Sequence, residues 1–468
     1  MKRLIWMAAP ALLAACASGP ESAAMRLPPQ PSVAPSWQAP MPTGSVGVDL
    51  AHWWSQVDDP LLPALIDAAQ SVSPTVSAAA SRIAAARAAR VVAGADVSLQ
   101  ANASALRGRL DPAGVTSTSL AMSGELRWDL DPFGARRAGQ TAAEARLDAA
   151  QDRWQDARSS LASEVATAYL TLRTCEAQLE QRQTDAASRA ETARLVGLTS
   201  QAGLASPADA ALSRASAAQA RALVVQQSTQ CQASVKGLVA LTGFDEAALR
   251  ERLHPARARL PRFAAFELPT LPAALLKQRP DLAEAERALS AAAADEQQAR
   301  ANQWPQVSIG GTLGVARLST SNVRLEGSTW TLGPIQISVP LFDGGARRAQ
   351  VDAARAAYDD AVVQYQARVR QAVREVEEAL LNLDSARQRE RDAQVATEGF
   401  EQVFLATEAR YRGGLASLLE LEDTRRTAIA ARTALIDLHQ DRLGAWISLY
   451  RALGGGWTPA QPARAAAR

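Results

Sequence analysis

The stretch "LTSQAGLASPADAAL", residues 198–212, and the stretch "EARYRGGLASLLEL", residues 408–421, share the tetrapeptide Gly-Leu-Ala-Ser. Each copy interrupts a long run rich in alanine, arginine, glutamate and glutamine, a composition that favours helix. Glycine tolerates the left-handed conformation that ends many helices, and Pro207 follows the first copy directly. We therefore expect Gly203 and Gly414 to mark the tips of two long helical hairpins, rather than kinks in continuous helices.

The two copies belong to an internal duplication with a fixed offset of 414 − 203 = 211 residues. Three further matches keep this offset: GARR at 134–137 and 345–348, Glu164-Val165 and Glu375-Val376, and Thr242-Gly243 opposite Leu453-Gly454. Two copies are too few for a solenoid. The chain is therefore expected to be a fused pair of similar repeats, residues 49–244 and 281–456, with a connection at 245–280 and a tail at 457–468.

Each repeat is expected to begin with a helix, roughly Ser73–Gly94 and Asp281–Asn302, and to continue with two strands. Alternation of apolar and polar residues predicts these strands at about 97–107 and 117–130, and at about 306–318 and 328–341. About ten residues of period two with a polar opposite face are typical of outer-membrane strands, and a pair of soluble hairpins is the alternative. A change of phase at Gly333-Pro334 predicts a bulge there.

After the strands the apolar spacing becomes helical. One stripe steps by four and three residues along a heptad seam: Leu161, Val165, Ala168, Leu172, Cys175 and Leu179. The helical hairpins are expected at about 134–242 and 345–453. From Gly134 to Gly203 a continuous helix would be roughly 100 Å long.

The N-terminus carries the features of an export signal. Residues 1–15 hold a basic start and an apolar run too short to span a membrane. The run ends in Leu13-Ala14-Ala15-Cys16, which resembles the bacterial lipobox, so Cys16 is expected to carry a covalent lipid; an ordinary signal peptide with an incidental cysteine is the alternative. Ala17 replaces the Asp that marks inner-membrane retention, and residues 16–48 are predicted to form a lipidated tether.

Composition argues against an enzyme and against a nucleic-acid partner. The net charge is only +2, and the three histidines lie far apart with no ligand spacing around them. We predict no catalytic residues, no metal and no cofactor apart from the lipid.

Four strands per chain cannot close a barrel, and an open sheet edge in lipid leaves costly unpaired backbone groups. The chains are therefore expected to associate. Two copies would supply eight strands and three would supply twelve, the latter leaving room for a lumen.

Four longer motifs give a specific resemblance: "HWWSQVDDPLLPALIDAA" from His52, "RPDLAEAERALSAAAADEQQARANQWPQVSIGG" from Arg279, "PLFDGGARRAQ" from Pro340 and "YRGGLASLLELEDTR" from Tyr411. With the lipobox, the sequence resembles the outer membrane factor (TolC-like) family, in its NodT-type branch of RND efflux lipoproteins. The resemblance implies an α+β membrane protein. Its homotrimer would form a 12-stranded outer-membrane β-barrel, a 12-helix periplasmic α-barrel and an equatorial domain of mixed structure, here at Leu50–Leu65, Phe244–Gln278 and the C-terminus.

The function that the resemblance implies is a passive exit duct in the outer membrane, exporting small toxic compounds. The implied partners are a periplasmic adaptor and an inner-membrane RND-type transporter. Two alternatives remain: the duct of a type I protein secretion system, and a lipid-anchored coiled-coil scaffold without a pore.

Acidic residues follow both predicted tips. Asp209 and Glu420 lie six residues after Gly203 and Gly414, and Asp423 is close behind. In a trimer they would form rings that favour cations and hold the duct shut, with Leu204 and Leu415 facing the adaptor and Tyr411 beside the second tip. The alternative is that these acids only stabilise helix N-termini. Relatives place an Arg in the lock where this chain has Ala416, so that contact is missing.

Cys175 and Cys231 lie at equal distances from the first tip, since 203 − 175 = 28 and 231 − 203 = 28. Residues equidistant from the turn of an antiparallel hairpin lie at the same height. We therefore predict a disulfide between them, which would persist in the periplasm; two buried free thiols are the alternative.

Overall fold

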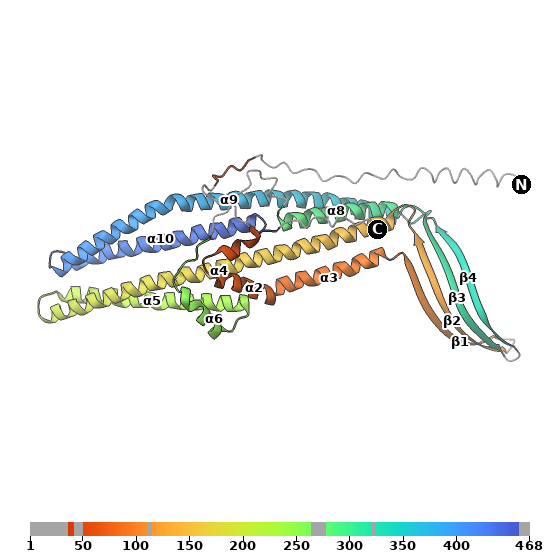
Figure 1. Ribbon diagram of the computed structural model, residues 1–468, viewed down its shortest axis with the longest axis horizontal. Coiled ribbons are helices and arrows are strands. Elements are labelled where there is room, and N and C mark those ends of the chain that lie inside the picture. The colour runs from red at the N-terminus through yellow and green to blue at the C-terminus, as the bar shows by residue number, and fades with distance from the viewer. Residues whose placement is uncertain (1–35, 42–49, 111–114, 264–277, 321–322, 458–468) are drawn as a thin grey trace. The chain divides into compact units, whose positions relative to one another are not determined.

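The computed structural model describes residues 36–41, 50–110, 115–263, 278–320 and 323–457 (Figure 1). By its contacts the chain divides into two compact units. The strand unit includes residues 81–151 and 284–366, and the hairpin unit includes residues 31–80, 152–283 and 367–468. Each unit takes parts from both sequence repeats, so the spatial division cuts across the division along the chain.

The strand unit contains one antiparallel sheet in the order β1-β2-β3-β4 (Figure 1). Its strands are β1 (Val97–Leu110), β2 (Val115–Leu130), β3 (Gln306–Thr320) and β4 (Arg324–Ser338). β2 and β3 come from different repeats and pair along fourteen positions, from Ser117↔Thr320 to Leu130↔Val307. β1 and β4 are the two edges, and each pairs with a neighbour on one side only.

The two faces of the sheet differ in polarity, as the alternation predicts. Leu99 lies opposite Leu126, and Leu313 opposite Trp330, so these side chains share one face. That face is exposed: 76% of Leu99 and 74% of Trp330 are accessible. The other face carries hydroxyl contacts such as Thr312 Oγ1 to Thr331 Oγ1 at 2.6 Å.

The predicted bulge is confirmed. Ile309 pairs with Ile335 but Gly311 pairs with Leu332, so β4 places two residues, Gly333 and Pro334, opposite the single Gly310 of β3. The extra residue restores Ile335 and Ile337 to the apolar face. β4 ends at Ser338, earlier than the predicted 341, because Pro340 has no N–H to donate to a ladder.

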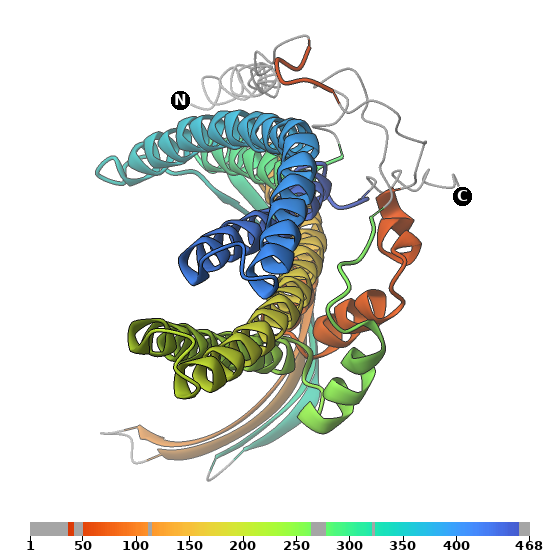
Figure 2. The same cartoon turned by 90° about the vertical axis from the view of Figure 1, so that its left-hand side faces the viewer.

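Two very long helices follow the strands, and each turns back at one of the repeated tetrapeptides. α4 (Ala135–Gln201) returns as α5 (Pro207–Thr242), and α9 (Ala346–Arg412) returns as α10 (Leu418–Ala452). Figures 1 and 2 show α5 beside α4 and α10 beside α9. The shorter helices α3 (Pro74–Gly94) and α8 (Pro280–Ala301) precede β1 and β3. Within the described ranges, no helix combines the length and apolarity needed to cross a membrane.

The core of the hairpin unit is built on the predicted heptad seam. Five of its six residues are at least nine-tenths buried; Ala168 is half-buried. Trp53 is fully buried and stacks on Tyr450 with 4.8 Å between ring centroids. The "HWW" motif thus fixes the N-terminal segment to α10.

The described parts of the equatorial segments contain short helices joined by turns and irregular stretches. They form η1 (Leu50–Gln56), α2 (Leu61–Val72), α6 (Glu246–Leu253) and η2 (His254–Ala256), whereas residues 264–277 lie outside the described part. A buried network ties them to α4. Asp59 accepts a hydrogen bond from Tyr169, and the fully buried Arg173 donates to Tyr169 Oη at 2.9 Å and to the Leu253 carbonyl at 3.0 Å.

Candidate functional site

All four residues of the repeated tetrapeptide can be assigned a place at the hairpin tips. Gly203 has φ of +76° and Gly414 has φ of +75°, the left-handed conformation that glycine adopts without strain. The Leu204 N–H donates to the Thr199 carbonyl at 2.8 Å, and the Gly203 N–H to the Ser200 carbonyl at 3.0 Å. This pair of bonds is a Schellman motif, and the second tip repeats it.

The serine of each tetrapeptide begins the returning helix. Ser206 accepts a hydrogen bond from the Asp209 N–H, and Ser417 accepts one from the Glu420 N–H, both at 3.1 Å. The alanine connects the end of one helix to the serine that begins the next, and the side chain of the leucine is not packed against either helix end. Leu204 is 81% exposed and Leu415 74% exposed, so each tip presents one bare apolar side chain.

Two of the three predicted gate acids, Asp209 and Glu420, stand at the third position of these helices, where a carboxylate is favourable to the helix dipole. Asp209 also accepts from the Ser206 hydroxyl at 2.8 Å. Glu420 forms an ion pair of 2.9 Å with Arg410, which donates in addition to the Leu415 carbonyl. Both acids therefore stand where a carboxylate stabilises a helix N-terminus, and the charge of Glu420 is also paired with Arg410.

The tips of the two hairpins also contact each other. An apolar cluster, the tip cluster, contains the buried Val196, Leu418 and Leu421, with Tyr411 and Phe404 packed against it. Burial, and next the charge of Asp209, raise the pKa of Tyr411, which places Asp209 of the first hairpin near Tyr411 of the second. Asp423 instead points to solvent, where it pairs with Arg426.

Sequence reasoning missed a set of charged residues behind this cluster. Glu422, Arg425 and Arg189 are mostly buried: Glu422 pairs with Arg189 of the other hairpin and with Arg425 of its own helix. Leu418, Leu421, Arg425 and Ala428 follow the three–four spacing of a seam, so a charged residue at a seam position was the available signal.

Cys175 and Cys231 form a disulfide, with 5.5 Å between their Cα atoms. The bond joins α4 to α5 at equal distances from Gly203, as the spacing predicts. The side-chain amide of Gln227 donates to the Cys175 carbonyl at 3.4 Å beside it. Cys16 lies outside the described residues.

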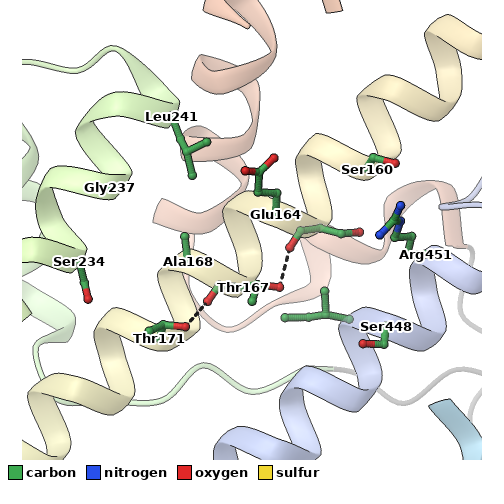
Figure 3. Close-up of a pocket in the computed structure, with 12 residues that line it drawn as sticks. Ser160, Glu164, Thr167, Ala168, Thr171, Ser234, Gly237, Leu241, Ser448 and Arg451 are labelled. Atoms are coloured by element: carbon green, nitrogen blue, oxygen red, sulfur yellow. Dashed lines mark hydrogen bonds between the residues drawn. The ribbon is translucent and has the colours of Figure 1, made fainter. Parts of the chain in front are cut away.

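A polar hollow lies over α4, between α5 and α10, with a volume of about 650 Å³ (Figure 3). Its wall is made largely of small side chains whose hydroxyls already donate to their own helix, as Thr167 does to Ser163 and Thr171 to Thr167, both at 2.8 Å. Glu164 and Arg451 are the charged side chains among its lining residues. The described residues contain no cluster of three side chains suited to a metal ion.

Comparison with known proteins agrees with this architecture. The sequence pattern described as "Outer membrane efflux protein" matches residues 65–244 and 271–455. The chain is similar to outer membrane protein OprJ of Pseudomonas aeruginosa, with 30% identity over 440 residues, 92% of this chain and 91% of the relative. It is 25% identical over 459 residues to Nodulation protein T of Rhizobium leguminosarum bv. trifolii, covering 96% of each.

Among solved structures, the chain resembles a membrane protein from Pseudomonas aeruginosa with a TM-score of 0.82 and 28% identity. The match covers 92% of this chain and 98% of that one. The four strands and long helices therefore form a fold already seen in a bacterial membrane protein.

Proposed function

Because the chain belongs to the outer membrane efflux protein family, we propose that it is the passive exit duct of a tripartite efflux system, carrying small toxic compounds out of the cell. The observation that carries this proposal is the four-stranded sheet with an apolar face, a polar face and two unpaired edges. In lipid such edges must be paired, so the sheet needs further copies to close. Three copies would supply twelve strands, with the polar faces lining a lumen.

The chain supplies no source of energy for transport. Its role is passage, and the partners that we propose are a periplasmic adaptor and an inner-membrane RND-type transporter. The exposed Leu204 and Leu415 at the tips are the side chains we assign to the adaptor contact. We assign the resting closure to the tips as well, with Asp209, Glu420 and Asp423 forming acidic rings around the threefold axis and Tyr411 beside Asp209.

We further propose that residues 1–15 are removed as a signal peptide and that Cys16 carries lipid in the outer membrane. The support is the lipobox and the similarity to Nodulation protein T. A further support for a tether that runs to α9 is that the N–H groups of Gln38 and Ala39 each donate to the Glu377 carboxylate at 2.8 Å.

Planar-bilayer recordings of the purified protein test the proposal. A duct gives stepwise currents that scale with salt concentration, whereas a scaffold without a pore gives none. A second experiment distinguishes an efflux duct for small molecules from the duct of a type I protein secretion system. A deletion strain should accumulate a fluorescent small-molecule dye and recover on complementation, whereas a type I secretion duct would instead restore export of a polypeptide to the medium.

A further inference from the structure

A run of exposed arginines follows the end of the first hairpin. The stretch "RERLHPARARLPR", residues 250–262, begins inside α6 and continues through η2. It holds one glutamate and five arginines, all of them exposed: Arg250, Arg252, Arg257, Arg259 and Arg262. Its formal charge is 5 − 1 = +4, whereas the whole chain carries only +2. This stretch, the basic segment, therefore concentrates positive charge that is balanced elsewhere in the chain.

Three arginines of the basic segment have no acidic partner. Arg250 forms an ion pair of 2.8 Å with Glu246 of its own helix. Within the part of the chain that the structure describes, no carboxylate lies at ion-pair distance from Arg257, Arg259 or Arg262. Three unpaired guanidinium groups within six residues create a local positive potential that attracts anionic partners.

The backbone of the basic segment is held in one conformation. Ala258 has φ of +60°, which is uncommon for a residue other than glycine and persists only where the surroundings enforce it. Its N–H donates to the Glu176 carboxylate of α4 at 3.1 Å. Four residues later, the Arg262 N–H donates to the Asp58 carboxylate at 2.7 Å. The main chain is thus fixed on both sides of Arg259, while the guanidinium groups remain exposed.

The basic segment and the polar hollow lie against opposite faces of α4. Glu164 lines the hollow, and Arg173 donates to the Leu253 carbonyl beside the basic segment at 3.0 Å. Nine residues separate Glu164 from Arg173, which is two and a half helical turns. Figure 2 shows α6, in green, on the same side of α4 as α2. In the proposed duct the bare face with the hollow suits the lumen, so the basic segment belongs to the outer side.

The surroundings of that outer side limit the choice of anionic partner. The protein is an outer-membrane channel that extends into the periplasm, where nucleic acid is absent. The large polyanions there are lipid headgroups and the cell wall, whose peptide stems carry carboxylates. From Ala135, where α4 leaves the strands, to Arg173 the helical path is about 57 Å long. Such a path from the membrane-embedded strands favours the wall over lipid.

We propose that the basic segment is a docking surface for the cell wall, with Arg257, Arg259 and Arg262 binding carboxylates of its peptide stems. The planar fork of an arginine side chain matches the two oxygens of a carboxylate. The proposal rests on the proposed duct for the outward position of the segment. Docking would fix the height at which the channel crosses the wall. Because the contact is exposed and electrostatic, salt should weaken it.

The test is co-sedimentation of the full-length trimer, in nanodiscs of neutral lipid, with purified cell-wall sacculi. The variant Arg257→Gln, Arg259→Gln, Arg262→Gln removes the three unpaired charges and leaves the backbone contacts of the segment in place. Sacculi whose carboxylates have been amidated remove the other partner. Flotation of the same nanodiscs with phosphatidylglycerol vesicles measures binding to anionic lipid.

The matched control removes three positive charges elsewhere in the hairpin unit. Its substitutions are Arg221→Gln, Arg370→Gln and Arg391→Gln, at exposed arginines of α5 and α9 that have no acidic partner among the described residues. Size-exclusion chromatography and melting temperature confirm that both variants remain folded trimers. Any difference between the two variants then reflects where the charge lies, and not how much charge is lost.

We expect the basic-segment variant to reduce the sedimented fraction at least about threefold at low salt, and the control to leave it near wild type. Amidated sacculi should bind wild type as weakly as intact sacculi bind the variant. No sedimentation of wild type, or equal sedimentation of both variants, would overturn the docking surface. Loss of vesicle flotation with unchanged sedimentation would assign the segment to lipid and overturn wall docking. Each of these results leaves the duct standing, because conductance in planar bilayers is measured without the wall.

Discussion

Arg442 of α10 donates to Glu390 of α9 at 2.8 Å, at the height of the second hairpin that matches Cys231 in the first, since 231 + 211 = 442. His439 Nε2 lies 3.3 Å from the same carboxylate. The counterpart of Cys175 is Ala386, which cannot form a covalent link. The first hairpin is therefore closed by a disulfide, and the second by a partly exposed ion pair that can separate and reform.

Removing the disulfide should destabilise the first hairpin. The bond closes a loop with a sequence separation of 56 residues, which predicts a loss of about 4 kcal/mol in the free energy of unfolding. Chemical denaturation of the Cys175→Ala, Cys231→Ala double variant measures this. A reducing agent should bring wild type to the same midpoint and leave the variant unchanged. Free alkylation of both cysteines in unreduced exported protein would refute the bond.

Gly314 should be intolerant of substitution because β2 passes close to it. A Cβ there would lie 2.6 Å from the Met122 carbonyl oxygen and 2.9 Å from the Ser123 Cβ. We expect Gly314→Ala to force β2 and β3 apart and to destabilise the sheet by about 1–3 kcal/mol. The measurement is the temperature at which trimers dissociate in detergent. Gly327→Ala on β4 is the matched control, because nothing lies within 4 Å of its added methyl group; equal effects would contradict the prediction.

Asp156 and Asp281 should respond to pH in opposite ways. Burial, and then the charge of Asp281, raise the pKa of Asp156. The folded protein therefore binds this proton more tightly than the unfolded chain, and stability falls as pH rises through the raised pKa. Asp156→Asn should raise the melting temperature at pH 7, with the gain vanishing as the pH falls below that pKa.

For Asp281, burial raises the pKa, but hydrogen bonds and charge from Arg279 outweigh it, and the net pKa is lowered. Its stabilisation is present above the ordinary carboxyl pKa and is lost as pH falls through the lowered one. Asp281→Asn should thus lower the melting temperature at pH 7. Melting curves of both variants between pH 3 and pH 7 measure these shifts in melting temperature. If the two variants shifted the melting temperature in the same direction at pH 7, the prediction would be contradicted.

At the tips, Asp209→Ala should reduce the cation preference of the duct more than Glu420→Ala does. The charge of Glu420 is paired with Arg410, whereas among the described residues Asp209 forms hydrogen bonds with the neutral Ser206 of its own cap. We expect about a twofold change in the permeability ratio for Asp209→Ala, and an increased cation preference for Arg410→Ala. Reversal potentials in a salt gradient give the ratio. An unchanged ratio in the Asp209→Ala, Glu420→Ala double variant would exclude an acidic gate.

Cys16→Ser should abolish lipid attachment, because the thioether needs the thiol. Mass spectrometry of the mature N-terminus should show a diacylglycerol on wild type and none on the variant. Some variant should still insert in the outer membrane, since the strands have an apolar face of their own. An unmodified mature N-terminus in wild type would contradict the lipobox assignment.

Local patterns were sufficient to predict the strands, the long helices and the tips. Period-two alternation located all four strands, and Gly203 and Gly414 located the turns, because these features depend on neighbours in sequence. The equal spacing of Cys175 and Cys231 predicted their disulfide for the same reason, because the turn at Gly203 sets how α4 and α5 are aligned.

The charged set around Glu422 could not be predicted in the same way. Its contacts join residues 233 positions apart, as between Arg189 and Glu422, and helical periodicity does not say which helix faces which. The compact units illustrate the same limit. Like parts of the two repeats pack together, so β2 lies against β3 rather than each repeat folding by itself.

The open edges of β1 and β4 have a genetic consequence. Each copy completes the sheet of its neighbours, so a copy that folds but cannot conduct is still built into the assembly. If three copies assemble at random from equal amounts of wild-type and defective chains, only about one trimer in eight is entirely wild type. A non-conducting allele should therefore be dominant over the intact gene, whereas an allele that fails to fold should be recessive.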